Sequence, residues 1–167
     1  MQVFTLGYQG LDLEVYTDTL LSAGVGLLID VRETAWSYNR RYIKGVLSRT
    51  MAAADIEYLH LKECGNPSSN RKTATSVSEC LRRYRTHLRE NSDCLITLLD
   101  YIRVAADGGR PACLTCYERE PHECHRSILL ELISEVHPSI QITHLHGDTD
   151  IKTDGALSLS SGATAQL

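Results

Sequence analysis

Short apolar runs alternate with helical segments along most of this chain, and that alternation restricts the fold more than any other feature of the sequence. Runs typical of strands lie at 3–6, 27–31, 56–61, 111–116 and 140–145. Segments with the spacing or caps of helices lie at 12–23, 43–54, 76–90, 92–106 and 124–137. Strands that alternate with helices favour a mostly parallel sheet covered on both faces. The sequence therefore predicts the α/β class: a single Rossmann-like three-layer domain with about five strands.

Caps and shifts of composition mark where these segments end. Ser76, with Glu79 three residues later, forms a capping box that predicts the start of a helix. The segment 65–75 is too polar for a core and predicts a loop. From 147 to 167 the composition shifts to Gly, Ser, Thr, Asp and Ala, which cannot bury enough apolar surface to offset ordering. We therefore expect one domain over 1–146 and a weakly ordered tail.

Composition and charge restrict the class of protein. With 167 residues, of which 43% are hydrophobic, the chain is long enough to bury a core. The net charge of −4 argues against bulk wrapping of nucleic acid, although a local basic patch is compatible with it. No signal peptide is visible, and no stretch approaches the roughly 20 apolar residues of a membrane-spanning helix. We expect a cytoplasmic protein without a membrane partner, whose six cysteines are reduced thiols.

Polar and aromatic side chains follow the predicted strands at their carboxyl ends. In a parallel sheet these ends meet along one edge, and ligands bind in the crevice beyond them. The residues that we predict to form a site at this edge are Tyr8, Asp30, Arg32, Trp36, Arg40, Asn66, Glu118, Cys124, His125, Arg126 and Ser127. They are far apart in sequence, so their convergence depends on the predicted sheet.

The strongest local signal is the segment 116–127, where a strand ends in a polar turn and a helix opens with Cys124, His125 and Arg126. A helix N-terminus carries unsatisfied N–H groups and a partial positive charge, so it attracts anions. Arg126 adds a planar two-pronged donor for phosphate or carboxylate. We expect a lowered pKa for Cys124 there, and acid–base roles for His125 and Glu118. The alternative is structural, with a small buried cysteine and an ion pair between Glu118 and Arg126.

Two further signals follow the second predicted strand. Asp30 interrupts an apolar run, and a buried carboxylate needs a partner, which Arg32 or Arg126 can supply. A structural salt bridge is an equal alternative for this pair. The segment 36–44 interleaves aromatic and basic residues, a composition that suits stacking on bases and contact with phosphates. The alternative is a solvated loop whose aromatic side chains pack on their own helix.

Residue types that bind metals also occur near the fourth predicted strand. Zinc-type ligands in this stretch are Cys113, Cys116, His122, Cys124 and His125. A spacing of three along a strand points Cys113 and Cys116 to opposite faces, which is wrong for a shared zinc ion. The pair His144 and His146 is a weaker candidate. The sequence therefore predicts no metal and no other cofactor, and a structural zinc ion is the disfavoured alternative.

Four groups of residues, in this order, form a specific set. They are Thr5-Leu6-Gly7-Tyr8, Leu28-Ile29-Asp30-Val31-Arg32, Ile56-Glu57-Tyr58-Leu59-His60-Leu61 with Gly65-Asn66, and Cys116-Tyr117-Glu118 with Cys124-His125-Arg126-Ser127. The set resembles the YeaO-like family known as domain of unknown function 488 (DUF488), over about residues 2–145. The resemblance implies a compact α/β domain in a bacterial or archaeal cytosol, and it implies no activity. The family usually has a Pro and then a Ser after Asp-Val-Arg, whereas Ala35-Trp36-Ser37 follow Thr34 here, so the loop is expected to contact a different ligand.

Three functions remain open. In the first and favoured one, the protein is an enzyme or binder that acts on a phosphate-bearing ligand, a nucleotide or nucleic acid. Arg126 and Arg32 then hold the phosphate, and Glu118, Asp30 and His125 are acid–base groups.

The second function is sulfur transfer or redox chemistry with Cys124 as the nucleophile. A fainter similarity to rhodanese sulfurtransferases points the same way, although Cys124 lies eight residues after Cys116, a longer loop than theirs. The third is a non-catalytic interaction module, in which the motif residues form a buried polar network. The sequence does not define the oligomeric state.

Overall fold

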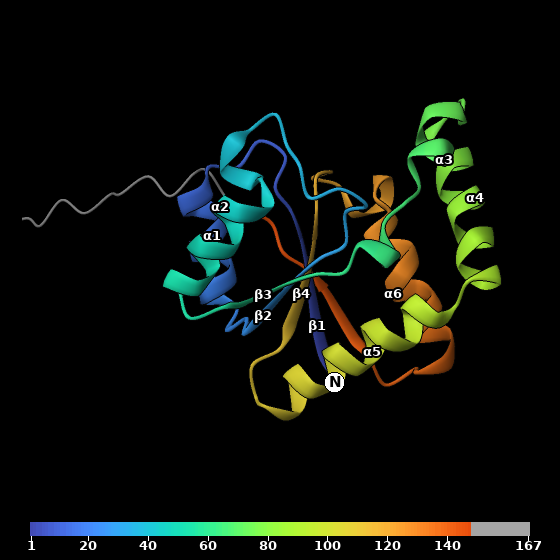
Figure 1. Cartoon of the computed structure of the whole chain (residues 1–167). Coiled ribbons are helices and arrows are strands. Elements are labelled where there is room, and N and C mark those ends of the chain that lie inside the picture. The colour runs from blue at the N-terminus through green and yellow to red at the C-terminus, as the bar shows by residue number, and fades with distance from the viewer. Residues whose placement is uncertain (148–167) are drawn as a thin grey trace, which may run out of the picture.

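A parallel five-stranded sheet forms the centre of the computed structural model, which describes residues 1–147. The strands are β1 (Gln2–Gly7), β2 (Leu27–Asp30), β3 (Glu57–His60), β4 (Ala112–Cys116) and β5 (Gln141–His144). They pair in the order β3-β2-β4-β1-β5 (Figure 1). β2 and β4 are buried at every residue, as strands covered on both faces must be. The tail predicted over 147–167 lies, apart from Gly147, outside the described residues.

Helices connect the strands and cover the sheet. Those in the described part of the chain are α1 (Leu13–Ser22), α2 (Lys44–Ala53), α3 (Ser68–Thr73), α4 (Val77–Glu90), α5 (Asp93–Asp107) and α6 (His125–Val136). Short 3₁₀ turns lie at Arg40–Tyr42, Lys62–Cys64 and Pro121–Glu123. The predicted α/β three-layer domain is therefore confirmed.

Two hydrophobic cores separate the layers. Tyr16 and Leu20 of α1 and Leu47 and Met51 of α2 pack in one core, on one face of the sheet. The apolar residues of α4, α5 and α6 pack in the other core, on the opposite face. In Figure 1, α1 and α2 lie to the left of the strands and α5 and α6 to the right. Each helix layer therefore buries its apolar stripe against one face of the sheet, which is how an α/β domain covers parallel strands.

All ten predicted elements are present with bounds within one residue of those expected, and one further helix was not predicted. The predicted N-cap is confirmed, because the Glu79 amide donates to Ser76 Oγ at 3.2 Å where α4 begins, while the Glu79 carboxylate accepts from the Thr75 amide rather than from Ser76. The prediction of a loop over 65–75 was wrong in part, since α3 lies within it. α3 buries no residue completely, and its Asn70 side chain donates to Asn66 Oδ1 and to the Cys80 carbonyl. Side-chain hydrogen bonds rather than apolar contacts hold this helix, so no apolar pattern could have revealed it.

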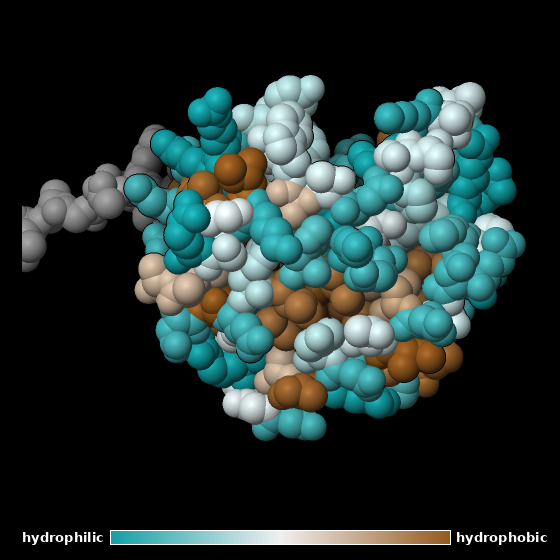
Figure 2. Space-filling model, in the orientation of Figure 1, coloured by the Kyte–Doolittle hydropathy of each residue, from teal (hydrophilic) through white to brown (hydrophobic). Residues whose placement is uncertain are grey.

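The surface differs between the helices. On the face shown in Figure 2, hydrophobic residues gather across the middle, where β3 and α5 lie, and mostly hydrophilic residues cover α3 and α4. The hydrophilic surface agrees with the sequence of α4, whose buried residues are Tyr84 and Leu88. Within residues 1–147, the helices all lack the length and apolar character that crossing a bilayer requires.

The register of the strands decides which residues meet at the carboxyl edge. Gly7, the last residue of β1, pairs with Cys116, the last residue of β4, and Asp30 of β2 pairs with Thr115. The residues that follow these three strands therefore emerge next to one another. The three central strands of the sheet all contribute to the site described next.

Candidate functional site

A pocket of about 620 Å³ lies at the carboxyl ends of β1, β2 and β4. It is lined by Tyr8, Gln9, Gly10, Arg32, Glu33, Thr34, Trp36, Ser37, Tyr38, Asn39, Asn66, Arg71, Cys116, Tyr117, Glu118 and His125. Its volume is in the range of sites for small molecules and cofactors. The position agrees with the general rule for parallel sheets, in which ligands bind beyond the strand ends.

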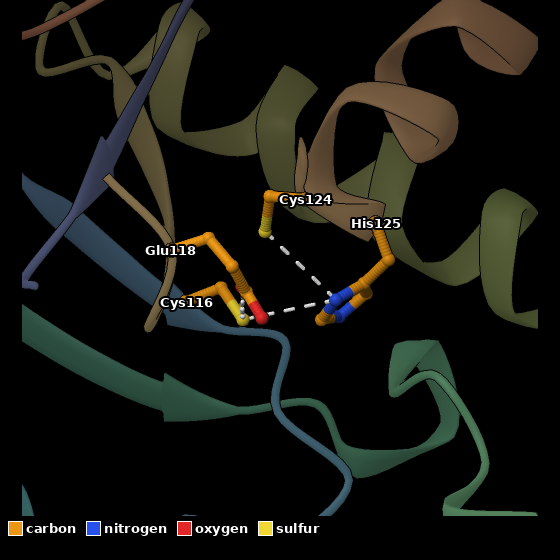
Figure 3. Close-up of side chains that lie close together, drawn as sticks. All are labelled: Cys116, Glu118, Cys124 and His125. Carbon is orange, nitrogen blue, oxygen red and sulfur yellow. Dashed lines mark hydrogen bonds between the residues drawn. The ribbon is translucent and has the colours of Figure 1, made fainter. Parts of the chain in front are cut away.

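A cluster of four side chains, Cys116, Glu118, Cys124 and His125, lies at this pocket (Figure 3). The Cys116 thiol donates to Glu118 Oε2 at 3.1 Å. His125 Nδ1 lies 3.7 Å from Cys116 Sγ and 3.9 Å from Cys124 Sγ. One donor atom from each residue lies within 4.8 Å of all the others. Three of the four line the pocket, and Cys124 lies behind them with 1% of its surface exposed.

Local backbone structure brings these side chains together. Cys116 ends β4, and Glu118 comes two residues later, so the extended chain puts both on one side. Cys124 is the N-cap residue of α6, with extended dihedral angles of φ −120° and ψ 141°, and His125 is the first residue of the helix. The change from extended to helical backbone between Cys124 and His125 lets two adjacent side chains face the same point.

The hydrogen bonding of His125 fixes which ring nitrogen faces the thiols. Nε2 lies 2.7 Å from the Val31 carbonyl oxygen, which can only accept. Nε2 therefore carries a hydrogen and donates it to Val31. In the neutral ring Nδ1 is then left with its lone pair, which points toward Cys116 and Cys124.

Burial changes the acid–base properties of the cluster. Burial raises the pKa of the Cys124 thiol well above its ordinary value, so the thiol form is favoured there. For Glu118, burial raises the pKa, but hydrogen bonds from the Cys124 and Cys116 thiols outweigh it and leave the pKa below its ordinary value. The cluster therefore combines an ionised carboxylate with protonated Cys124.

Two residues outside the cluster hold the loop that carries Glu118. The Arg126 guanidinium is 1% exposed and donates to the carbonyl oxygens of Glu118 and Arg119. Its Nε has no hydrogen-bond partner in residues 1–147. On the other side, a Cβ at Gly7 would lie 1.8 Å from the Glu118 carbonyl oxygen. The loop can approach β1 this closely only because residue 7 is a glycine.

A buried ion pair supports the opposite wall of the pocket. Arg32 donates to Asp30 through Nε at 2.8 Å and through Nη2 at 2.5 Å, and Asp30 is fully buried. Asp30 also accepts from the Tyr58 hydroxyl at 2.6 Å. Arg32 Nη1 donates to the Tyr8 hydroxyl and to the Tyr42 carbonyl. Most N–H groups of Arg32 are therefore used inside the protein.

Two groups of aromatic side chains lie at the pocket, one that runs from the core outward through Tyr8 and one pair at the rim. Tyr8 stacks on Tyr42, with ring centroids 4.2 Å apart, and its edge meets Tyr117 at 5.5 Å. Trp36 and Tyr38 meet edge to face at 4.6 Å. Trp36, Tyr38 and Tyr117 are 56%, 94% and 49% exposed. The rim thus offers large aromatic surfaces to a ligand.

The structure places six of the predicted site residues on the pocket wall and five elsewhere. Those on the wall are Tyr8, Arg32, Trp36, Asn66, Glu118 and His125. Cys124 and Asp30 lie directly behind the wall, in contact with lining residues. Ser127 donates to the Cys124 carbonyl, Arg126 faces backbone carbonyls, and Arg40 is exposed in a 3₁₀ turn. The ion pair expected between Glu118 and Arg126 is replaced by Arg126 binding the backbone of that loop.

Several lining residues were not among the predicted site residues. They include Gln9, Arg71, Tyr38, Tyr117 and Cys116. A signal for Cys116 was present, because the alternation of a strand puts it on the same side as Glu118. Arg71 belongs to α3 and came from a segment predicted as loop, so its position at the pocket had no signal.

The residues that could hold a metal ion differ from the set weighed in the sequence. Cys113 and Cys116 do face opposite sides of β4, since they pack in separate hydrophobic cores. Within the described chain, the donors that do converge are the four of the cluster, Cys116, Glu118, Cys124 and His125. The expectation of no cofactor stays a prediction.

Comparisons with known proteins give one match. Residues 12–133 match a family described as Domain of unknown function DUF488. The searches of curated proteins and of solved structures returned no match. The matched range contains the loop 33–39, Asn66, Arg71 and the whole cluster.

Proposed function

The chain belongs to the DUF488 family, whose description names no activity, and from the geometry of the pocket we propose that it binds a ligand carrying a nucleobase and acts on it. The ligand is a nucleotide or a nucleotide unit of a nucleic acid. Its base stacks on the aromatic rim, and its reacting group meets the cluster of Cys116, Glu118 and His125. Six free cysteines support a reducing compartment, and we propose the cytoplasm of a prokaryote.

The observation that carries this proposal is the exposure of three aromatic side chains around one pocket. Trp36, Tyr38 and Tyr117 leave much of their ring surface open to solvent, although the Tyr8 and Tyr42 rings next to them are buried. Stacking of a base on such a ring contributes about 1–3 kcal/mol per base and requires little sequence specificity. A planar heterocycle is therefore the chemical group that this rim fits best.

Phosphate has a smaller part in the proposal than the sequence suggested. Arg32 is paired with Asp30, and Arg71 with Glu33 at 2.9 Å. Arg71 is half exposed, and within residues 1–147 some of its N–H groups donate no hydrogen bond. Of these two arginines, it is therefore the one that a phosphate could reach. Because Arg32 and Arg71 are each already paired with a carboxylate, most of the binding affinity for a nucleotide must come from its base.

The floor of the pocket supplies the groups for chemistry. Glu118 is positioned to accept a proton, and His125 Nδ1 and the Cys116 thiol lie beside it. The burial of Cys116 and His125 limits access of water to them, which strengthens their interactions with a reacting group. This arrangement supports proton transfer to or from a heterocycle.

Thiol chemistry at Cys124 has less support. Cys124 is 1% exposed, does not line the pocket, and has a pKa raised by burial. A nucleophilic cysteine needs access and a lowered pKa. The interaction module is also less supported, because a module would not need three ionisable groups on the wall of a pocket.

Replacing Trp36 with alanine is expected to weaken nucleobase binding by about 5- to 150-fold, the factor that corresponds to losing one stacked base. Trp36 is the single tryptophan of the chain, so quenching of its fluorescence reports binding in the wild type. Isothermal titration calorimetry with each common nucleoside and its 5′-monophosphate measures the variant. The affinities of a nucleoside and its monophosphate should agree within about fivefold, because an exposed ion pair contributes at most about 1 kcal/mol.

Tyr101→Ala is the matched control, since Tyr101 is also a partly exposed aromatic residue but lies on α5 and does not line this pocket. It should leave the affinity unchanged. If no nucleoside or monophosphate changes the emission of Trp36, and calorimetry also detects no heat of binding, the proposed function is wrong.

A further inference from the structure

We infer that Cys116, Glu118, Cys124 and His125 form a binding site for a divalent metal ion of the zinc class at the floor of the pocket. This inference goes beyond the proposed function, because it does not depend on which ligand the pocket binds. It rests on the geometry of the four donor atoms, on the orientation of the imidazole, and on the chemistry of the donor set.

The distances between donor atoms match those that a tetrahedral ion requires. Bonds of about 2.3 Å to sulfur and about 2.0–2.1 Å to nitrogen or oxygen put the ligand atoms of a tetrahedral ion about 3.3–3.8 Å apart. His125 Nδ1 lies 3.7 Å from Cys116 Sγ and 3.9 Å from Cys124 Sγ. The largest separation within the set is at most 4.8 Å, and Cys116 Sγ and Glu118 Oε2 are 3.1 Å apart. Small side-chain rotations therefore suffice to surround one ion.

The second observation is the outer hydrogen bond of the imidazole. A histidine that binds a metal through one nitrogen almost always donates the other N–H to a carbonyl or carboxylate. His125 does this through Nε2, which is 2.7 Å from the Val31 carbonyl oxygen. Val31 directly follows β2, so the sheet itself sets the ring orientation. Nδ1 is thereby held toward the two sulfur atoms, as Figure 3 shows.

The four side chains offer more lone pairs than hydrogens that could bind them. The two thiols supply two hydrogens, whereas lone pairs are present on the carboxylate, on the imidazole nitrogen and on both sulfur atoms. When a divalent cation binds, both thiol protons leave to solvent, and two Zn–S bonds form. Two thiolates balance the charge of the ion, and Glu118 adds one negative charge. Two sulfur donors and an imidazole favour zinc over magnesium or calcium, which prefer oxygen ligands.

Glu118 differs from the other three donors in its position. It is only partly buried and lies on the pocket wall, whereas Cys124 is enclosed. It is therefore the ligand that can leave the ion, open a coordination position toward the pocket and accept a proton there, while His125 and both sulfur atoms stay on the ion. Zinc sites that keep such an exchangeable position are the ones that support catalysis.

Cobalt(II) is the probe for this site, because thiolate ligands give it a charge-transfer band and tetrahedral geometry gives it intense visible absorption. The full chain is freed of metal with a chelator, titrated with Co²⁺, and then with Zn²⁺. We expect one Co²⁺ per chain, both spectral signatures, and their loss as Zn²⁺ displaces Co²⁺. Cys116→Ala and Cys124→Ala should each lower the affinity more than about 100-fold, since loss of even an outer partner costs 10–100-fold.

Cys113→Ala is the matched control, because Cys113 lies on the same strand but packs in the opposite core. It should retain both bands. Glu118→Gln should keep the thiolate charge-transfer band and weaken the binding. Absence of the bands in the wild-type protein, or their persistence in both Cys116→Ala and Cys124→Ala, would overturn the inference. Nucleoside binding is measured separately through Trp36, with and without metal, so failure of one proposal leaves the other open to its own test.

Discussion

Replacing Asp30 with alanine is expected to lower the free energy of unfolding by about 3–5 kcal/mol, the cost of removing one partner of a buried ion pair. Asp30 is fully buried and Arg32 is 6% exposed. The substitution leaves the Arg32 guanidinium without the one carboxylate that pairs with it in residues 1–147 and removes the acceptor of the Tyr58 hydroxyl. Urea denaturation followed by circular dichroism measures the change.

An exposed ion pair of the same chain provides the control. Asp12 pairs with Arg41 at 3.2 Å, and their side chains are 77% and 61% exposed. Asp12→Ala should cost less than about 1 kcal/mol, because water and salt screen an exposed pair. An equal, small loss for Asp30→Ala and Asp12→Ala would show that solvent compensates Arg32 through the pocket.

The substitution Gly7→Ala is expected to cost about 3 kcal/mol or more, above the usual 1–3 kcal/mol for an overpacked core. The new Cβ would lie 1.8 Å from the Glu118 carbonyl oxygen and 2.6 Å from its carbon. Both are backbone atoms, so no side-chain rotation can relieve the overlap. The loop would have to move away from β1, and the Arg126 hydrogen bonds to Glu118 and Arg119 would be strained.

Thermal and urea unfolding measure this loss, and Co²⁺ binding measures the displacement of Glu118. Gly45→Ala is the control, since Gly45 lies in α2 and the nearest atom to its Cβ is the Arg49 side chain at 3.6 Å. It should stabilise the protein by about 0.5–1 kcal/mol, because alanine is the better helix former. If Gly7→Ala is as stable as the wild type, the close approach of the loop to β1 is wrong.

The sequence predicted the layers well, because a helix or strand that packs against a layer carries apolar residues at a regular spacing. Strand β2 was found from its continuous apolar run, and α4 from Ser76 and Glu79. These signals lie within a few neighbouring residues, so they can be read without knowledge of the tertiary structure. Helix α3 has none, since polar contacts hold it: Asn70 donates to Asn66 and Cys80, which are near in sequence, and Arg71 pairs with Glu33, 38 residues away. Its existence depends on tertiary structure that a pattern of residues does not contain.

The site was predicted in its location but less well in the direction of its side chains. Strand-end placement brought Tyr8, Arg32 and Glu118 to one pocket, as a parallel sheet requires. Arg126 was expected to face a ligand. It lies in the first turn of α6, where side chains point back toward the helix start, and it meets the backbone carbonyls of the preceding loop instead. Side-chain direction at a helix terminus depends on that loop, which the sequence did not define.

The position of β4 in the sheet has a consequence for folding during synthesis on the ribosome. β4 is the central strand but comes fourth in the chain, and β1 and β2 are joined only through it. While the ribosome is still making the first hundred or so residues, β2 can pair with β3, but β1 has no strand beside it. Open strand edges invite pairing with other chains. Nascent chains that stall before Ala112 should therefore be prone to aggregation, and the domain should fold only after β4 has left the ribosome.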